Sequence, residues 1–496
     1  YNVYVNDAAP LTGKVNAGSS AVVPVQAREG MNTFVVTLTN AAGASPKARL
    51  SAYAGYDTPK PIEKLTLNVD AARRADLTWT APTATEHGGF LGALTYDLIR
   101  ITGTDTTQVA NGISDVHFAE VLPEGPLMGY RYAVRAHNQS QVTTWTNSNN
   151  AVVGSPIEPP FFDEFANAAD AELYTVIDNN NDQASWAWDK DPYTEQTAYR
   201  YHWSDTEKAD DWLLLPPLRL RAGTVYTFQF KAKSNGTDYT ERFEVKWGQA
   251  PNPAGLTKVI LNPTEVSTDE YQTFTNELHP QADGTYYIGF HALSDAGGYY
   301  LHIDSVSIAA PIAAAAPAAA ENLKGKADPS GKLLTTLTFD APKLKVDGTA
   351  LSNIERIEVR NGLRLVKAFT QPAPGASLTA TDNRATTGDN VYTVIAFNAD
   401  GAGATATKNI YVGQDQPATP VIAAEDLTNA VRLSWPAVGG ANGGLVIPEE
   451  VTYNIYNVRD GGYRGDLIAT VTGGKTEYVV PDQKTTEGNQ RYAQWA

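Results

Sequence analysis

Residues 226–230 read Tyr-Thr-Phe-Gln-Phe, and residues 284–290 read Gly-Thr-Tyr-Tyr-Ile-Gly-Phe. Apolar and polar side chains alternate along the first stretch, as in a β-strand with one buried face. This alternation dominates the chain and is punctuated by 40 glycines and 29 prolines, whereas long stretches with the helical period are scarce. At 496 residues the chain is too long for one hydrophobic core. We therefore expect an all-β chain divided into several sandwiches.

The composition limits the kinds of partner. Asp and Glu number 55 and Lys and Arg 38, which gives a formal charge of −17 at pH 7. That charge opposes binding to nucleic acid or to an anionic membrane. No apolar run approaches the ~20 residues of a transmembrane helix, so we expect no membrane insertion by this segment. The sequence has no cysteine, which excludes disulfides, thiolate metal sites and a cysteine nucleophile.

A repeated pattern lies on both sides of the central stretch. Residues 77–82 read LTWTAP and residues 337–342 read LTFDAP. The third residue of each motif precedes a strand tyrosine, Tyr132 or Tyr392, by 53 residues (132 − 79 and 392 − 339). The pattern resembles that of fibronectin type III domains, with an aromatic residue before Ala-Pro on the B strand and a tyrosine on the F strand. The resemblance implies two-sheet sandwiches filled by large B, C and F side chains.

Partial copies of this pattern lie at both ends. A third copy begins with LSWPA at residues 433–437 and reaches RYAQWA at residues 491–496, inside its expected F strand. The opening YNVYVN, residues 1–6, is similar to YNIYN at residues 453–457, the C strand of that copy. A sandwich without two strands exposes sheet edges and half a core, so we expect a longer array. A genuinely short chain with unusual ends is the alternative.

The central stretch does not repeat. It contains FFDEF at residues 161–165, DNNND at residues 178–182 before a tryptophan, and IDSV at residues 303–306. These motifs resemble the first strand, acidic loop and last strand of cleaved-adhesin (choice-of-anchor J, MAM-like) jelly-roll domains of secreted bacterial surface proteins. Asn180 stands where the family has an acid, and Asn181 where it has a glycine. The resemblance implies a bacterial extracellular or cell-surface location.

The expected fold is therefore an all-β, multidomain array of antiparallel β-sandwiches, with a central jelly roll between fibronectin type III-like modules. Short proline-bearing joints should hold neighbouring domains at fairly fixed angles. The expected domains are a partial fibronectin type III-like module at 1–56 (strands C to G), a complete one at 57–155, the jelly roll at 156–311, an Ala/Pro linker at 312–320, a complete module at 321–414 and a partial one at 415–496 (strands A to F).

Calcium is the expected cofactor, as a structural ion. Residues 178–182 place oxygen-bearing side chains at the one-three-five spacing of a calcium loop, although the glycine and terminal glutamate of an EF-hand are absent. The resemblance implies a site near the seam of the first and last strands, which commonly pair in jelly rolls. A simple polar turn is the alternative. The candidate ligands are Asp163, Glu164, Asp178, Asn180, Asp182 and Asp304.

Seven Trp and Tyr residues between 186 and 212 suggest sugar binding, because aromatic faces stack on the apolar faces of pyranose rings. The alternation around Trp186 and Trp212 predicts that these two belong to the core. The expected ligand-binding residues at the surface are Trp188, Tyr193, Tyr201 and Trp203.

No catalytic motif is present: the sequence has no Gly-x-Ser-x-Gly elbow and no His-Glu-x-x-His helix. We expect a non-catalytic, adhesin-like protein whose jelly roll binds a glycan or protein ligand while the other modules act as spacers. The alternatives are a structural stalk or filament subunit that self-assembles, and an accessory region of a larger secreted hydrolase. A solvent-open aromatic platform would favour binding, whereas fully packed rings would favour the stalk.

Overall fold

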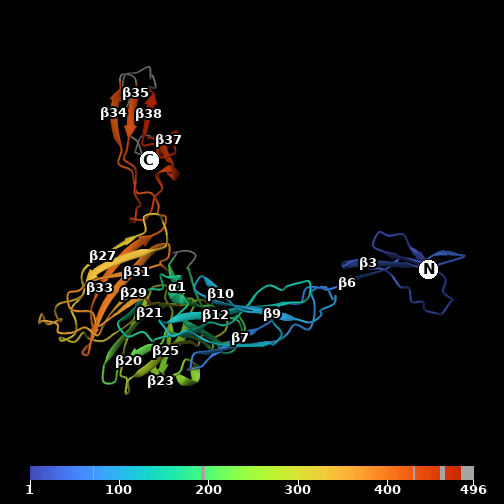
Figure 1. Cartoon of the computed structure of the whole chain (residues 1–496), viewed down its shortest axis with the longest axis horizontal. Coiled ribbons are helices and arrows are strands. Elements are labelled where there is room, and N and C mark those ends of the chain that lie inside the picture. The colour runs from blue at the N-terminus through green and yellow to red at the C-terminus, as the bar shows by residue number, and fades with distance from the viewer. Residues whose placement is uncertain (71, 191–195, 428–429, 459–463, 482–496) are drawn as a thin grey trace.

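The structure is a computed structural model that describes residues 1–70, 72–190, 196–427, 430–458 and 464–481. Over these ranges the chain is all-β, with antiparallel sheets that form several β-sandwiches, so the predicted fold class is confirmed (Figure 1). No helix in the described ranges has the length and apolar character needed to cross a bilayer. The helical elements of this part are α1 (Ala168–Ala171) and the 3-10 segments η1 (Pro253–Gly255) and η2 (Pro448–Glu450).

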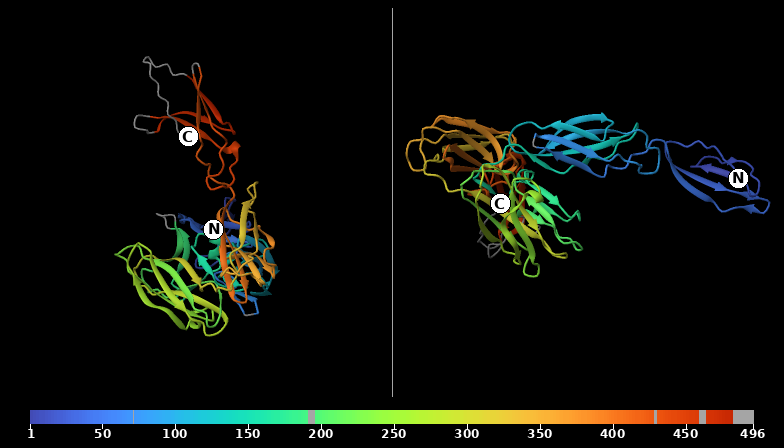
Figure 2. Two further views of the ribbon diagram at one scale, coloured as in Figure 1. Left: turned by 90° about the vertical axis from the view of Figure 1, so that its left-hand side faces the viewer. Right: turned by 90° about the horizontal axis from the view of Figure 1, so that it is seen from below.

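Three sandwiches gather in the middle of the molecule, and smaller β units project from this group at the two ends of the chain (Figures 1 and 2). In chain order we call these units the first sheet (β1–β6), the second sandwich (β7–β14), the central sandwich (β15–β26), the third sandwich (β27–β33) and the last sandwich (β34–β38).

The central sandwich has two six-stranded sheets. One sheet has the order β17-β18-β26-β21-β24, with β15 also pairing β26; the other has the order β16-β19-β25-β22-β23, with β20 also pairing β25. Within the central sandwich, the first of these two sheets contains β15 (Phe161–Asp163), β17 (Trp186–Lys190), β18 (Thr197–Tyr201), β21 (Tyr226–Lys233), β24 (Gln272–Leu278) and β26 (Leu301–Ala309). The second contains β16 (Thr175–Asp178), β19 (Asp211–Leu214), β20 (Leu218–Leu220), β22 (Glu241–Gly248), β23 (Lys258–Val266) and β25 (Gly284–Ala292).

The alternation along the strands decides which side chains enter the core. On β21 the odd-even pattern buries Phe228 and Phe230 and exposes Gln229 between them. Phe230 meets Phe290 of the facing sheet edge to face, with ring centroids 4.9 Å apart. The pairing of β15 with β26 confirms the expected contact between the first and last strands of this unit.

The second and third sandwiches each contain two antiparallel sheets. The second has β7 (Leu65–Val69), β8 (Arg74–Trp79) and β11 (His117–Val121) in one sheet and β9 (Thr95–Thr102), β10 (Asp105–Ile113), β12 (Met128–His137), β13 (Thr146–Asn147) and β14 (Ala151–Val153) in the other. The third has β27 (Glu321–Ala327), β28 (Thr335–Asp340) and β31 (Ser377–Asp382) facing β29 (Arg356–Asn361), β30 (Arg364–Thr370), β32 (Gly388–Asn398) and β33 (Gly401–Val412).

The sequence repeat corresponds to a repeated buried contact. Tyr132 on β12 and Tyr392 on β32 are both fully buried. The Tyr132 hydroxyl donates to Glu120 at 2.6 Å, and the Tyr392 hydroxyl donates to Asp382 at 2.9 Å. Because a buried hydroxyl needs a partner, each copy places a carboxylate on the facing sheet to accept it.

The remaining strands form the smaller units at the two ends. In the last sandwich, one sheet has the order β34-β35-β38 and the other pairs β36 with β37. Residues 491–496, its expected F strand, lie outside the described residues. The strands of the first sheet are β1 (Asn2–Val5), β2 (Leu11–Thr12), β3 (Gly30–Thr37) and β6 (Ala48–Ala54), with β4 (Thr39–Asn40) and β5 (Gly43–Ala44) as a small ladder beside them. Those of the last sandwich are β34 (Ala423–Leu427), β35 (Ala430–Ser434), β36 (Tyr453–Val458), β37 (Arg464–Val471) and β38 (Glu477–Pro481).

The Ala/Pro segment at 312–320 is attached to the third sandwich. Ala316 is fully buried, and its carbonyl accepts a hydrogen bond from the Val346 backbone at 2.9 Å. The Asn398 side chain donates to the carbonyl of Ala315 at 2.9 Å. The segment therefore forms part of the packing of the third sandwich.

Helix α1 lies where the three middle sandwiches meet (Figure 1). Arg131 of the second sandwich donates to the Glu172 carboxylate at 3.0 Å, and Asn150 donates to the Glu172 carbonyl at 2.7 Å. On the other side, the Leu363 backbone of the third sandwich donates to Asp170 at 3.2 Å. Both neighbours are therefore attached to the same short segment of the central sandwich.

Candidate functional site

Three carboxylates converge at one end of the second sheet of the central sandwich. Asp178 ends β16 and Asp211 begins β19, and the antiparallel register places these two residues directly opposite each other. Asp182 follows from the loop after β16, and ligand oxygens of all three lie within 4.8 Å of one another. Asp211 is buried and the other two are half-buried. We call this group the acidic triad.

Each carboxylate of the triad uses one oxygen within the fold and leaves the other without a partner. Asp178 Oδ2 accepts from the backbone of Gln183 at 3.0 Å, and Asp182 Oδ1 accepts from the backbone of Ala184 at 2.9 Å. The second oxygens, Asp178 Oδ1, Asp182 Oδ2 and Asp211 Oδ1, are buried without a hydrogen-bond partner. Buried polar atoms are almost always satisfied, so three such oxygens in one place fit a bound cation.

The same sheet holds another buried acid. Glu241 at the start of β22 is fully buried, and its Oε2 also lacks a partner. Burial, followed by the charges of Asp178 and Asp182, raises the pKa of Asp211 to about 7, and burial raises the pKa of Glu241. After the larger effect of burial, the charges of all four carboxylates also raise the pKa of the Tyr201 hydroxyl. The site thus favours protonation or a cation.

The conformation of the loop that carries Asp182 limits what the one-three-five spacing of its side chains can predict. Asn181 and Gln183 have φ angles of 58° and 70°, the left-handed region that asparagine tolerates better than most residues. Asn181 therefore has a backbone conformation that glycine also adopts readily. The Asn180 side-chain amide donates to the Lys208 carbonyl at 2.9 Å and so ties the loop to a neighbouring segment.

The other predicted ligands lie together at the seam of β15 and β26, apart from the triad. Asp163 is buried, and its carboxylate accepts from the Phe165 backbone at 2.8 Å and from the Tyr174 hydroxyl at 2.9 Å. Asp304 accepts from the Ser305 backbone at 2.6 Å. Burial, followed by the charges of Asp304 and Glu164, raises the pKa of Asp163, and burial with the charge of Glu164 raises the pKa of Asp304. Within the described ranges, however, only the triad brings three acidic or histidine ligand atoms within 4.8 Å of one another.

A surface cluster of rings extends the same sheet seam at its other end. Tyr201 pairs with Leu301, so the residues that follow β18 lie opposite those that precede β26. Trp203 packs against Tyr299 with ring centroids 4.4 Å apart, and Tyr299 stacks on Tyr239 at 4.9 Å. The aromatic cluster, as we call it, comprises His202, Trp203, Tyr239, Tyr299 and Tyr300.

Polar groups surround these rings. Arg200 lies over the Tyr300 ring, 4.5 Å from its centroid, and is ion-paired with Asp189. Asp189 Oδ2 also lies 3.0 Å from His202 Nε2, within hydrogen-bond distance. The Trp203 indole donates to Asp205 at 3.1 Å. Tyr239 is 39% exposed and Trp203 is half-buried, so the cluster presents ring surface and hydrogen-bonding groups together.

Glu241 contacts the segment that carries the aromatic cluster. Its Oε1 accepts from the Tyr299 backbone at 2.6 Å, whereas its Oε2 has no hydrogen-bond partner. Gly298 approaches so closely that a side chain there would meet Glu241 Oε1 at 2.8 Å. Whatever holds the Glu241 carboxylate therefore also positions the segment that carries Tyr299.

The aromatic residues predicted to bind a ligand differ in their positions and burial. Trp203 lies in the aromatic cluster, and Trp188 is half-buried and donates to the Phe165 carbonyl at 2.7 Å. Tyr201 is a correction: it is 1% exposed and packs edge to face on Trp186, because its place in the alternation of β18 points inward. Tyr193 lies outside the described residues. The core positions predicted for Trp186 and Trp212 are confirmed.

Several site residues were not predicted from the sequence. Asp211 and Glu241 lie on strands separated from the acidic loop, and Tyr239, Tyr299 and Tyr300 come from loops far along the chain. One signal was available for Asp211, because it is an acid at the start of the otherwise apolar run Trp-Leu-Leu-Leu.

No protein-family model matches the sequence, and a comparison with curated proteins gives no match. Among solved structures, part of the chain is similar to a cleaved adhesin domain of Lys-gingipain from Porphyromonas gingivalis, at 18% identity, over 31% of this chain and 99% of that domain, with a TM-score of 0.27.

Two further similarities concern carbohydrate-active proteins. A xylan-binding domain from Paenibacillus barcinonensis is 12% identical over 30% of this chain and 99% of its own length, with a TM-score of 0.23. The glycoside hydrolase domain of Endo-D from Streptococcus pneumoniae is 11% identical over 48% of this chain and 36% of its own, with a TM-score of 0.24. Similarities at TM-scores below 0.5 do not identify a ligand or an activity for this chain.

Proposed function

We propose that the chain is a non-catalytic, bacterial cell-surface or secreted protein whose central sandwich binds a glycan at the aromatic cluster. The observation that carries this proposal is the surface stack of Tyr239, Tyr299 and Trp203. Ring faces of this kind pack on the apolar faces of pyranose rings. Asp189, which contacts His202, and Asp205, which accepts from the Trp203 indole, supply carboxylate oxygens that can accept hydrogen bonds from sugar hydroxyls.

Calcium is the cation that the acidic triad suits best, because every candidate ligand atom is a carboxylate oxygen. Asp178, Asp182 and Asp211 would hold the ion. When bound, the ion supplies positive charge to a group of acids that otherwise repel one another, and its binding energy adds to folding. The charges of the triad act on Tyr201, which ends β18 two residues before Trp203, so the same ion would stabilise the start of the aromatic cluster.

The other sandwiches act as spacers and supports. The second and third sandwiches contact the central one at α1, so they fix its orientation as well as its distance from an anchor. Modules of this kind contact only near neighbours, which lets an array present one binding domain away from a surface.

A printed array of plant, host and microbial glycans tests the proposal. The whole chain, loaded with calcium, should bind a restricted set of glycans, and the Trp203→Ala variant should bind that set about 10-fold more weakly while remaining folded. Binding of no glycan, or equal binding by wild type and variant, would contradict it. Loss of binding on addition of a chelator would show that glycan recognition requires the metal.

A further inference from the structure

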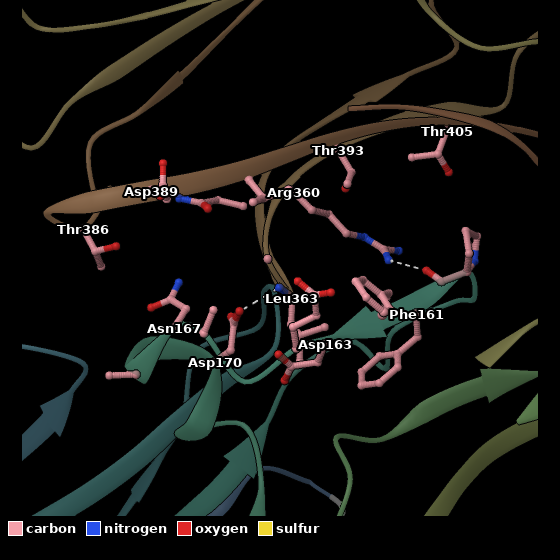
Figure 3. A pocket seen from close by; sticks show the side chains of 18 of the residues that line it. Phe161, Asp163, Asn167, Asp170, Arg360, Leu363, Thr386, Asp389, Thr393 and Thr405 are labelled. Carbon is pink, nitrogen blue, oxygen red and sulfur yellow. Dashed lines mark hydrogen bonds between the residues drawn. The ribbon is translucent and has the colours of Figure 1, made fainter. Parts of the chain in front are cut away.

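A cavity of about 630 Å³ lies between the central and third sandwiches (Figure 3). β15, the loop after it and α1 form one wall, and β29, β32 and β33 form the other. The cavity is separate from the aromatic cluster and the acidic triad, none of whose residues lines it. Its volume is in the range of sites that take a small organic group.

The two walls are held together by hydrogen bonds at two places. At the first, the Leu363 backbone donates to Asp170 at 3.2 Å (Figure 3). At the second, the Arg360 guanidinium donates to the carbonyls of Pro160 at 3.3 Å and of Glu158 at 3.1 Å. These partners are backbone groups or buried side chains, so the separation of the walls is fixed by the fold.

Apolar side chains cover much of the interior surface. Phe162 on β15 is 56% exposed, although the residues on either side of it are buried. Val391 on β32 is 46% exposed and faces the same space. Exposed rings and β-branched residues that line a common cavity offer contact area to an apolar stem.

The charged groups of the cavity are predominantly acidic. Asp163, Glu164 and Asp389 line it, and neither Glu164 nor Asp389 forms an ion pair in the described part of the chain. The basic residue among the described lining groups, Arg360, is paired with Glu358. Burial, together with the charges of Asp304 and Glu164, raises the pKa of Asp163 to about 6, as expected where negative charge is not balanced.

We propose that this cavity binds a cationic group on an apolar stem, namely the side chain of an arginine or lysine from a partner polypeptide. The aliphatic stem packs on Phe162 and Val391, and the cation is attracted by Glu164 and Asp389, one on each wall. A guanidinium also stacks favourably on an aromatic face such as that of Phe162. Because the site needs both sandwiches, it exists only in the assembled chain.

Fluorescence anisotropy with labelled five-residue peptides tests this proposal. The probes are Gly-Gly-Arg-Gly-Gly, the same peptide with neutral citrulline in place of arginine, and the same peptide with glutamate. With the whole chain we expect saturable binding of the arginine peptide that weakens as salt is added, and at least 10-fold weaker binding of the citrulline peptide.

Variants separate the cavity from general charge effects. The double variant Glu164→Gln with Asp389→Asn should weaken arginine-peptide binding at least 10-fold, because both acids are exposed and their removal leaves the fold intact. Thr393→Trp, which fills the cavity from β32, should abolish binding. Glu265→Gln removes an exposed acid elsewhere on the central sandwich and should change nothing.

The proposal is overturned by absence of saturable arginine-peptide binding, by equal binding of the citrulline peptide, or by unchanged binding to the double variant. A saccharide whose binding is lost in Thr393→Trp, without arginine-peptide binding, would assign the cavity to a neutral ligand and would also overturn it. The outcome is independent of the aromatic cluster, since Trp203→Ala should leave peptide binding unchanged.

Discussion

Asp178 faces Asp211 directly across the pairing of β16 with β19, and Asp182 brings a third carboxylate to the same point. Like charges in opposite positions destabilise a sheet. Their free oxygens have no hydrogen-bond partner, so the arrangement is stable only when a cation or a proton balances the charge. This relationship makes the metal site the feature of the central sandwich that is most directly open to test.

Calcium should raise the melting temperature of the central sandwich. An ion that binds only the folded state at 100 times its Kd adds about 2.7 kcal/mol. In Asp211→Asn the calcium-dependent shift should fall by more than half, whereas Asp269→Asn, which changes an exposed acid outside the triad, should keep the full shift. Differential scanning calorimetry with calcium or chelator measures both, and an equal shift in the two variants would exclude the triad as the site.

The calcium effect should depend on pH. The pKa of Asp211 is raised to about 7 in the folded chain from about 4 when unfolded, so without metal its contribution to stability is favourable below the unfolded pKa and is lost as pH rises through 7. Calcium competes with that proton. The melting temperature in chelator should therefore fall between pH 5.5 and 8, and the calcium-dependent increase should be larger at pH 8.

The matched control for this prediction is Asp211→Asn, which removes the titrating group. Its melting temperature in chelator should vary less over the same pH range than that of the wild type. A calcium-dependent increase that is larger at pH 5.5 than at pH 8 would contradict the assignment.

Much of the fold could be predicted because its determinants are local. Alternation along stretches such as residues 226–230 reports which face is buried, and the 53-residue spacing shared by Tyr132 and Tyr392 reflects two sandwiches with the same aromatic packing. The packing of the middle sandwiches around α1 could not be predicted, because it depends on single contacts such as that of Leu363 with Asp170, 193 residues apart.

The site was only partly predictable for the same reason. Asp178 and Asp182 share a loop whose spacing is visible in the sequence, but Asp211 joins them through strand pairing. Trp203 is half-buried in the aromatic cluster, and its role in binding stays a prediction. The surface position predicted for Tyr201 was wrong, although the alternation Tyr199-Arg200-Tyr201 already places both tyrosines inside. Alternate residues of a strand share one face, so Tyr199 and Tyr201 are expected on the same side of the sheet.

Removal of single rings from the aromatic cluster should weaken glycan binding without unfolding the chain. Tyr299→Ala and Trp203→Ala each remove one face of the stack, and a stacked ring contributes about 0.5–1.5 kcal/mol beyond its buried area. We expect about 10-fold weaker binding of the strongest array glycan in each variant. Trp145→Ala, which removes a partly exposed tryptophan from the second sandwich, should bind as the wild type does.

The buried tyrosine–carboxylate pairs should contribute similarly to the stability of the two repeated sandwiches. Tyr392→Phe leaves the buried Asp382 with Arg364 and Asn361 but without its hydroxyl donor. Loss of a hydrogen bond to a charged group costs about 1.5–3 kcal/mol. Hydrogen exchange of the whole chain, followed by mass spectrometry, should show about 10- to 100-fold faster exchange in β29 and β32.

The corresponding change in the second sandwich is Tyr132→Phe, which removes the donor to Glu120. It should accelerate exchange in β9 and β12 and leave the third sandwich unchanged. Exchange that accelerates in both sandwiches in either variant would show that the two units do not unfold independently.

The central claim is that a calcium-held aromatic cluster binds a sugar, and isothermal titration calorimetry of the strongest array glycan with the whole chain tests it most directly. We predict saturable binding in calcium that weakens at least 10-fold in chelator and again in a variant with both Trp203→Ala and Tyr299→Ala. Binding of the same strength in all three samples would contradict the claim.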